Sequence, residues 1–306
     1  MTDILKRIER QVGVDNLVDV LSERLDTSDL NSLLMEVARR RAQKRTPAAL
    51  LDDYRSNRFV KPSTVDPAVT LAWDQIAFAS LPPGFEAIEL SPVCPLGTSS
   101  VVATVNQDKV VTTTRGLEVM SDATNALALE CALRRRNHGS ASPVHLAASH
   151  RVVRPSLTAN PLFTPHFRLF ALCSAGRDTQ SSRLRDSALA GHVGAHVRAL
   201  TAFLGSTAKL RIAVTVLEEG ARPAVSTVVD GFRGTHEGVE VDFDDSRTTG
   251  RGYYKEVCFK IYCHTADGPQ EIGDGGLVDW GAKLLSNAKE RMFISGIGSE
   301  RVCGLL

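Results

Sequence analysis

Residues Val144 to Asp178, VHLAASHRVVRPSLTANPLFTPHFRLFALCSAGRD, contain two alternating runs joined by a loop rich in proline and small polar residues. Alternation with period two is typical of a β-strand whose faces differ chemically, so the stretch predicts a long antiparallel hairpin. Arg151 lies in the first run, among small and apolar residues. A guanidinium in a sheet either pairs with a neighbouring acid or binds an anionic ligand, and the hairpin alone leaves both alternatives open.

Composition points to an ordinary soluble globular protein. The chain has 306 residues, of which 43% are hydrophobic and 23% are charged, and this is enough to bury a full core. The formal charge of +1 provides no global field that would attract a polyanion. No apolar run reaches the length of a membrane span, and the start, MTDILKRIERQ, lacks the apolar stretch of a signal peptide. We therefore expect a cytoplasmic protein.

The cysteines do not follow a metal or redox pattern. None of the six belongs to a C-x-x-C pair, and most lie in apolar runs. We interpret them as reduced, buried side chains.

Residues 1–65 predict a helical N-terminal appendage, and residues 66–306 predict the core. Apolar residues recur at helical spacing through the appendage, and Thr46 followed by Pro47 is a typical helix start. Its one basic run, residues 39–45, is explained by a solvated helix end that complements the helix dipole, or by a phosphate-binding surface. The first explanation is the simpler one.

The rest of the chain predicts strands interrupted by a few helices, which is an α+β pattern and not regular βαβ alternation. Gly273, Gly275 and Gly276 are interpreted as a flexible turn. The run from Tyr253 to His264 alternates, with one face for the core and a second that either lines a pocket or meets solvent. The other expected strands are 85–93, 96–105, 109–114, 211–217, 238–243 and 292–294, and the expected helices are 69–78, 124–136, 187–204 and 280–289.

Several short segments, taken in order, resemble the class II aminoacyl-tRNA synthetase catalytic core. The resemblance is strongest to its histidyl-tRNA synthetase branch and to the related regulatory subunit of ATP phosphoribosyltransferase. The matching segments are Gly84-Phe85 with Pro92, Ser121-Asp122-Ala123-Thr124, His150-Arg151-Val152-Val153-Arg154-Pro155, Tyr253-Tyr254, Gly275-Gly276 with Asp279, and Gly296-Ile297-Gly298-Ser299-Glu300-Arg301. The resemblance implies an antiparallel sheet flanked by helices, and a homodimer.

The resemblance also implies a ligand site. Arg151 and Arg301 would bind the phosphates of ATP, with Mg²⁺ as the accompanying ion, and would neutralise charge that develops there. The amino-acid pocket would be formed by Asp122, Thr124, Tyr254, Tyr262, Gly275 and Gly276. Without the resemblance, pairing of the two arginines with sheet acids such as Glu256 is the simpler explanation.

The departures from the family pattern bear on function. Val153 stands where the second motif carries an acid, and Leu172 and Met120 replace polar positions of the pocket. The loop from Pro155 to Pro165 contains no Lys, Arg, Asp or Glu, so it offers no charged contact to a tRNA phosphate. The sequence ends five residues after Arg301, and we expect no anticodon-binding domain on that side.

Three functions remain open. The first is a paralogue without tRNA charging that binds a nucleotide or small amino acid and regulates a protein partner, or acts as a homodimer. The second is an enzyme that forms an adenylate from ATP and a carboxylate and passes it to an acceptor other than tRNA. The third is an interaction protein that binds its partner through the N-terminal helices. The departures favour the first function, and retention of Arg151, Arg301 and Asp122 favours the second.

Overall fold

A computed structural model describes residues 2–137, 142–155, 164–179, 183–236 and 238–306. The chain divides into two units, Met1–Lys61 with Thr112–Leu117, and Pro62–Val111 with Glu118–Leu306. The expected domain boundary at residue 65 stays a prediction. No helix among the described residues is long and apolar enough to cross a membrane.

The first unit is built from helices whose starts follow the sequence signals. Asp26 accepts a hydrogen bond from the Asp29 amide at the start of α3, and Thr46 accepts one from the Ala49 amide at the start of α4. No described side chain of this unit is buried. Its elements are α1 (Thr2–Val12), α2 (Leu17–Asp19), η1 (Val20–Arg24), α3 (Thr27–Gln43), α4 (Pro47–Ser56) and η2 (Arg58–Val60).

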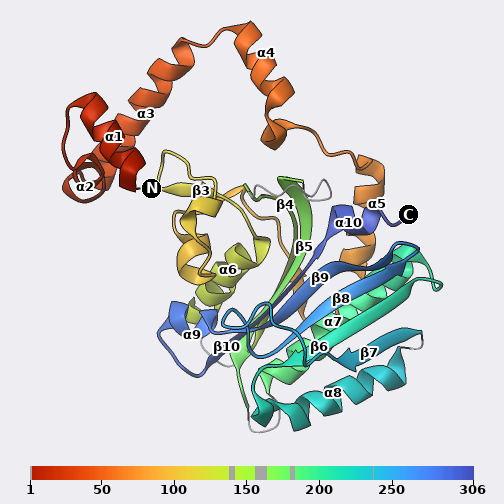
Figure 1. Ribbon diagram of the computed structural model, residues 1–306. Helices are drawn as coiled ribbons and strands as arrows, with labels where there is room; N and C mark the ends of the chain where they lie inside the picture. The colour runs from red at the N-terminus through yellow and green to blue at the C-terminus, as the bar shows by residue number, and fades with distance from the viewer. Residues whose placement is uncertain (1, 138–141, 156–163, 180–182, 237) are drawn as a thin grey trace. The chain divides into compact units, whose positions relative to one another are not determined.

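The second unit contains an eight-stranded sheet in the order β1-β4-β5-β10-β9-β8-β6-β7 (Figure 1). Only the two edge pairs, β1 with β4 and β6 with β7, are parallel. The central hairpin predicted from the alternation is present, with Ala147 opposite Leu172. The strands are β1 (Phe85–Ala87), β4 (Val144–Val153), β5 (His166–Arg177), β6 (Lys209–Val216), β7 (Val239–Phe243), β8 (Lys255–Thr265), β9 (Gly268–Val278) and β10 (Glu290–Gly298).

Helices cover both faces of the sheet because alternate strand residues point to opposite sides. Ala147 belongs to a core cluster with residues of α5 (Pro67–Ala79), α7 (Leu184–Leu204) and α8 (Arg222–Thr235). Leu146 and Ala148 belong to a second cluster with residues of α6 (Ala123–Asn137) and α9 (Trp280–Leu285). All six cysteines are free and buried, as expected.

The segment expected to form strands at 96–105 and 109–114 does not do so. It contains the short helical turns η3 (Thr98–Val102) and η4 (Gln107–Lys109), and only two three-residue strands, β2 (Val93–Pro95) and β3 (Leu117–Val119), pair nearby. Glu118 explains the difference. Its buried carboxylate accepts hydrogen bonds from the amides of Gly97 and Ser99, at 2.9 and 2.8 Å, and these tertiary contacts override the local strand preference.

Two further predictions differ from the structure. The glycines at 273, 275 and 276 form no turn, because they lie inside β9 between β8 and β10. A Cβ at Gly275 would lie 2.5 Å from the Ser295 Cβ, so the close approach of the neighbouring strand requires glycine there. Helix α8 has no counterpart among the expected elements. The chain closes with α10 (Ser299–Cys303), a single helical turn.

Candidate functional site

Arg151 projects from β4 toward α10, where it meets an acid. Its Nη2 donates to Glu300 Oε1 at 2.7 Å, and its Nη1 lies 2.9 Å from His166 Nδ1. The other oxygen of Glu300 accepts from the Arg168 amide. Arg151 of the sheet is therefore paired with an acid of α10, and pairing with an acid is the first of the two alternatives that its sequence position left open.

Arg301, on α10, lies in a different electrostatic environment. Its Nη1 donates to the Glu271 carbonyl at 3.0 Å. Loss of solvent is the main cause that lowers the pKa of Arg301. The carboxylate of Glu271 opposes this shift, the charge of Arg154 adds to it, and Asp274 opposes it. The charge of Arg154, three residues beyond Arg151, therefore acts on Arg301.

Arg154 follows the end of β4 and joins it to the segment before α6. Its Nη2 donates to Asp122 Oδ2 at 2.8 Å, and its Nε donates to the Ser121 carbonyl at 2.9 Å. Asp122 Oδ1 accepts from the Thr124 amide at 2.9 Å and from its hydroxyl at 2.7 Å. The structure therefore joins Asp122 to Thr124 and to Arg154.

Tyr254 precedes β8, and its hydroxyl donates to Asp274 Oδ2 of β9 at 3.0 Å. Burial is the main cause that raises the pKa of Asp274, although 45% of its side chain is exposed. Burial also raises the pKa of Tyr253, and the nearby charges of Asp122 and Asp274 raise it further. We call Asp122, Arg154, Tyr254, Asp274 and Arg301 the candidate site.

Arg247 is a functional candidate that the sequence did not reveal. Its side chain is 4% exposed, and its Nη2 lies 3.7 Å from Asp274 Oδ2. Its guanidinium lies over the Tyr254 ring, 5.7 Å from the centroid, and its Nη1 has no hydrogen-bond partner among the described residues. An unsatisfied buried donor is costly unless a ligand or water completes it. The sequence signal for it is an arginine seven residues before Tyr254, in Arg247-Thr-Thr-Gly-Arg-Gly-Tyr-Tyr254.

The remaining predicted pocket residues are divided. Gly276 packs against Tyr254, since a Cβ there would lie 2.6 Å from the Tyr254 Cδ1, whereas Gly275 faces Ser295 and Phe259. Tyr262 lies elsewhere on β8, where the Arg211 guanidinium is 5.7 Å from its ring centroid. The structure therefore groups Gly276 with Tyr254, and it places Tyr262 beside Arg211 of β6.

The residues present fit a phosphate better than a protein-held metal ion. Arg154 and Arg301 are guanidinium groups of the kind that bind phosphate. No group of three or more His, Cys, Asp or Glu among the described residues could hold a metal ion. Magnesium that accompanies a nucleotide is held largely by phosphates and water, with one or two carboxylates, so such an ion would need only Glu271 or Asp274 nearby.

Solved structures share this fold. A histidyl-tRNA synthetase from Nostoc sp. PCC 7120 is 15% identical, with a TM-score of 0.63 over 82% of this chain and 75% of that one. An ATP phosphoribosyltransferase regulatory subunit/histidyl-tRNA synthetase from Bacillus halodurans C is 15% identical, with a TM-score of 0.60 over 81% and 82%. A histidine–tRNA ligase subunit from Alicyclobacillus acidocaldarius is 13% identical, with a TM-score of 0.59 over 86% and 96%.

No protein-family model matches the chain, and no curated protein matches its sequence. At these identities the structural likeness shows the fold alone. The chain has the class II synthetase-like fold, with a mostly antiparallel sheet flanked by helices, as the sequence motifs predicted.

Proposed function

We propose that this class II synthetase-like protein does not charge tRNA and instead binds a nucleotide or a small amino acid in a regulatory role. The observation that carries the proposal is the pairing of Arg154 with Asp122, together with the charge of Arg154 that acts on Arg301. Arginines are suited to a phosphate or carboxylate, and acids are suited to an ammonium group. Arg154 and Arg301 can therefore bind the phosphate or carboxylate of such a ligand, and Asp122 can bind its ammonium group.

We assign the phosphate contact to Arg154 and Arg301. Arg154 bonds to the acid of the expected amino-acid pocket, and its charge acts on Arg301. Arg151 bonds to Glu300 and His166 instead, so its phosphate role is the weaker alternative and is tested beside Arg154. The buried, unsatisfied Nη1 of Arg247 is a further donor near Tyr254.

The regulatory role rests on three supports. The loop from Pro155 to Pro165 carries no charged side chain for a tRNA phosphate, although its residues 156–163 lie outside the described part of the chain. A structure of similar fold is named as a regulatory subunit. The first unit buries none of its described side chains, so its helices are free to form a partner surface. We further propose a homodimer and a cytoplasmic location.

A second function is favoured by the two arginines themselves. Arg154 and Arg301 are close enough for the charge of one to act on the other, and two guanidinium groups suit the triphosphate of ATP better than a single carboxylate. An enzyme that forms an adenylate from a carboxylate, with ATP and Mg²⁺, and passes it to an acceptor other than tRNA would use them in this way.

Pyrophosphate exchange separates the two functions. The full chain is assayed with ATP and each of a panel of amino acids, beside thermal-shift measurements with the same compounds. The regulatory function predicts a raised melting temperature without exchange, because a ligand that binds the native state stabilises it. Exchange that disappears in Arg154→Ala would establish the enzyme, and no shift with any compound would exclude the proposed binding role.

A further inference from the structure

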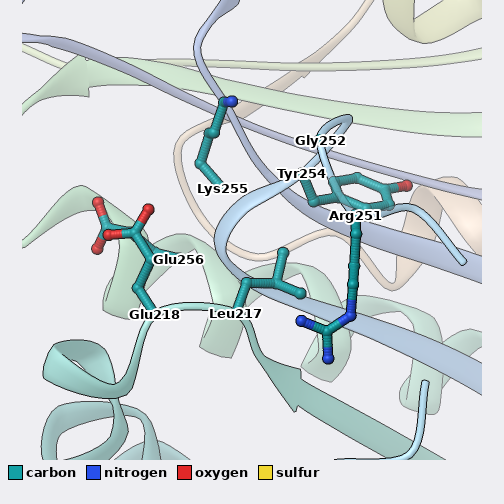
Figure 2. Close-up of a pocket in the computed structure, with 7 residues that line it drawn as sticks. All are labelled: Leu217, Glu218, Arg251, Gly252, Tyr254, Lys255 and Glu256. Atoms are coloured by element: carbon teal, nitrogen blue, oxygen red, sulfur yellow. The ribbon is translucent and has the colours of Figure 1, made fainter. Parts of the chain in front are cut away.

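A cavity of about 220 Å³ lies where β6 ends and β8 begins (Figure 2). The two residues that follow β6 line it on one side, and one segment around the start of β8 lines it on the other. The lining residues are Leu217, Glu218, Arg251, Gly252, Tyr254, Lys255 and Glu256. Of the candidate site, only Tyr254 reaches this cavity, with its ring, while the Tyr254 hydroxyl bonds to Asp274. The cavity is therefore a separate space.

Two glycines present Arg251 to the cavity. Gly250 and Gly252 have φ of 80° and 87°, which L residues with a side chain rarely adopt. A Cβ at Gly250 would also lie 3.2 Å from the Tyr254 Cδ2. The exposed Arg251 side chain is anchored by its Nε, which donates to the Arg247 carbonyl at 3.2 Å. The turn thus holds a guanidinium at the edge of the cavity.

Glu256 is held in an unusual backbone conformation on the other side. Its φ is 51°, within an irregularity of the β8·β9 ladder between Lys255 and Cys258. Its carbonyl accepts from the amides of Leu217, at 2.7 Å, and Glu218, at 3.3 Å, so the two glutamates are joined through their backbones. Strain of this kind clusters at ligand sites, where the surrounding structure enforces it.

Behind Glu256 lies Arg185, a buried arginine that is not fully satisfied. Its side chain is 2% exposed, and its Nη1 donates to Glu256 Oε2 at 2.6 Å. Its Nη2 has no hydrogen-bond partner among the described residues. Arg185 holds the Glu256 carboxylate beside the cavity by this ion pair, whereas Glu218 has no ion pair in the described part of the chain.

We propose that this cavity binds a small zwitterion, an α-amino acid with an apolar side chain. Figure 2 shows the Arg251 guanidinium on one side of the cavity and the carboxylates of Glu218 and Glu256 on the other, with Leu217 between them. The ligand carboxylate binds Arg251, the ammonium binds Glu218, and the side chain contacts Leu217 and the Tyr254 ring. The volume is below that of drug-sized pockets, which suits an amino acid.

Calorimetric titration of the full chain tests this site, with L-valine as the probe. Isobutylamine lacks the carboxylate of valine, and isovalerate lacks its ammonium group. We expect valine to bind and each analogue to bind at least about tenfold more weakly, since each loses one charged contact. Arg251→Ala and Glu218→Gln should each weaken valine binding by a similar factor. Arg55→Ala, an exposed arginine of the other unit, should leave it unchanged.

Three results would overturn the assignment: no valine binding up to about 10 mM, equal binding of the analogues, or full affinity in a folded Arg251→Ala variant. The proposal does not depend on the proposed function. Loss of valine affinity in Arg154→Ala, with full affinity retained in Arg251→Ala, would assign the valine to the candidate site instead of this cavity.

Discussion

Arg154 Nη2 and Asp122 Oδ2 are 2.8 Å apart, and this ion pair joins the end of β4 to the segment that leads into α6. The pair is partly open to solvent, with 43% of the Arg154 side chain and 24% of the Asp122 side chain exposed. A ligand can therefore compete for either group without unfolding the sheet, in contrast to the ion pairs of the interior.

Replacing Asp122 should cost little stability. Because solvent screens the pair, Asp122→Asn is expected to lower the free energy of unfolding by no more than about 1 kcal/mol. Urea denaturation measures it. A loss of several kcal/mol would mean that Asp122 serves the fold, and that changes in binding by this variant cannot be assigned to the ligand.

Glu290 is the opposite case. Its carboxylate, 3% exposed, accepts two hydrogen bonds from Arg135 at 3.0 Å and one from Arg177 at 2.6 Å. Glu290→Gln leaves the charge of Arg135 buried without a counter-ion, so we expect a loss of about 3–5 kcal/mol in urea. Glu219→Gln, which breaks an exposed pair with Arg222, is the control and should change stability by less than about 1 kcal/mol. Equal effects of the two variants would contradict this account.

Two buried histidines of α7 predict a pH dependence. His192 and His196 both bond to the Ser295 hydroxyl, at 2.8 and 2.7 Å. Burial lowers the pKa of His196 to about 3, and burial is also the main cause that lowers the pKa of His192. Below about pH 6.5 the histidines of the unfolded chain bind protons, whereas the buried histidines of the folded chain stay neutral. Their contribution to the free energy of unfolding is therefore fully present above that pH and is lost as the pH falls toward about 3.

The contribution of His196 can be isolated by His196→Gln, whose amide replaces Nε2 without titrating. Between pH 8 and pH 5, where carboxylates remain ionised, the wild type should lose roughly 2 kcal/mol more than this variant. Urea curves at each pH provide the measurement, and His264→Gln, at an exposed position, is the control. Parallel pH profiles for wild type and His196→Gln would refute the assignment.

Gly276 should not tolerate a side chain. A Cβ there would lie 2.6 Å from the Tyr254 Cδ1 and 2.7 Å from the Val257 carbonyl oxygen. Gly276→Ala is expected to cost about 1–3 kcal/mol and to displace Tyr254. Gly231→Ala, in α8 with nothing within 4 Å, should instead stabilise by up to about 1 kcal/mol. Thermal unfolding compares the two variants. A Gly276→Ala variant with unchanged stability would contradict the close packing of β9 against Tyr254 and Val257.

Periodicity predicts the elements whose own apolar side chains recur at the spacing of a strand or a helix. The hairpin of β4 and β5 and the helices α5, α6 and α7 follow from alternation or helical spacing in the sequence. Strand β9 could not be recognised, because Gly273, Gly275 and Gly276 lack side chains that favour a strand, and their need for glycine arises from neighbouring strands. Likewise, the buried Glu118 carboxylate reshapes residues 96–105 from outside that segment.

The candidate site divides in the same way. Asp122 and Thr124 belong to one predicted motif and bond to each other, and Tyr254 lies next to Gly276, which was also assigned to the pocket. Arg154, Arg247 and Asp274 were not assigned to the site. Their proximity depends on where β4 ends and on how the segment before β8 folds back onto β9. Neither feature produces a periodic pattern in the sequence from which it could be predicted.

The central claim is that phosphate binds between Arg154 and Arg301, and calorimetry with Mg²⁺ and ATP on single variants tests it most directly. Each of Arg154→Ala and Arg301→Ala should weaken ATP binding about 10- to 100-fold, the value of one charged contact, with the fold confirmed by circular dichroism. Arg151→Ala should weaken it by less than about threefold. Loss of ATP binding in Arg151→Ala together with full affinity in Arg154→Ala would contradict the account and would assign the phosphate contact to Arg151 of the central hairpin.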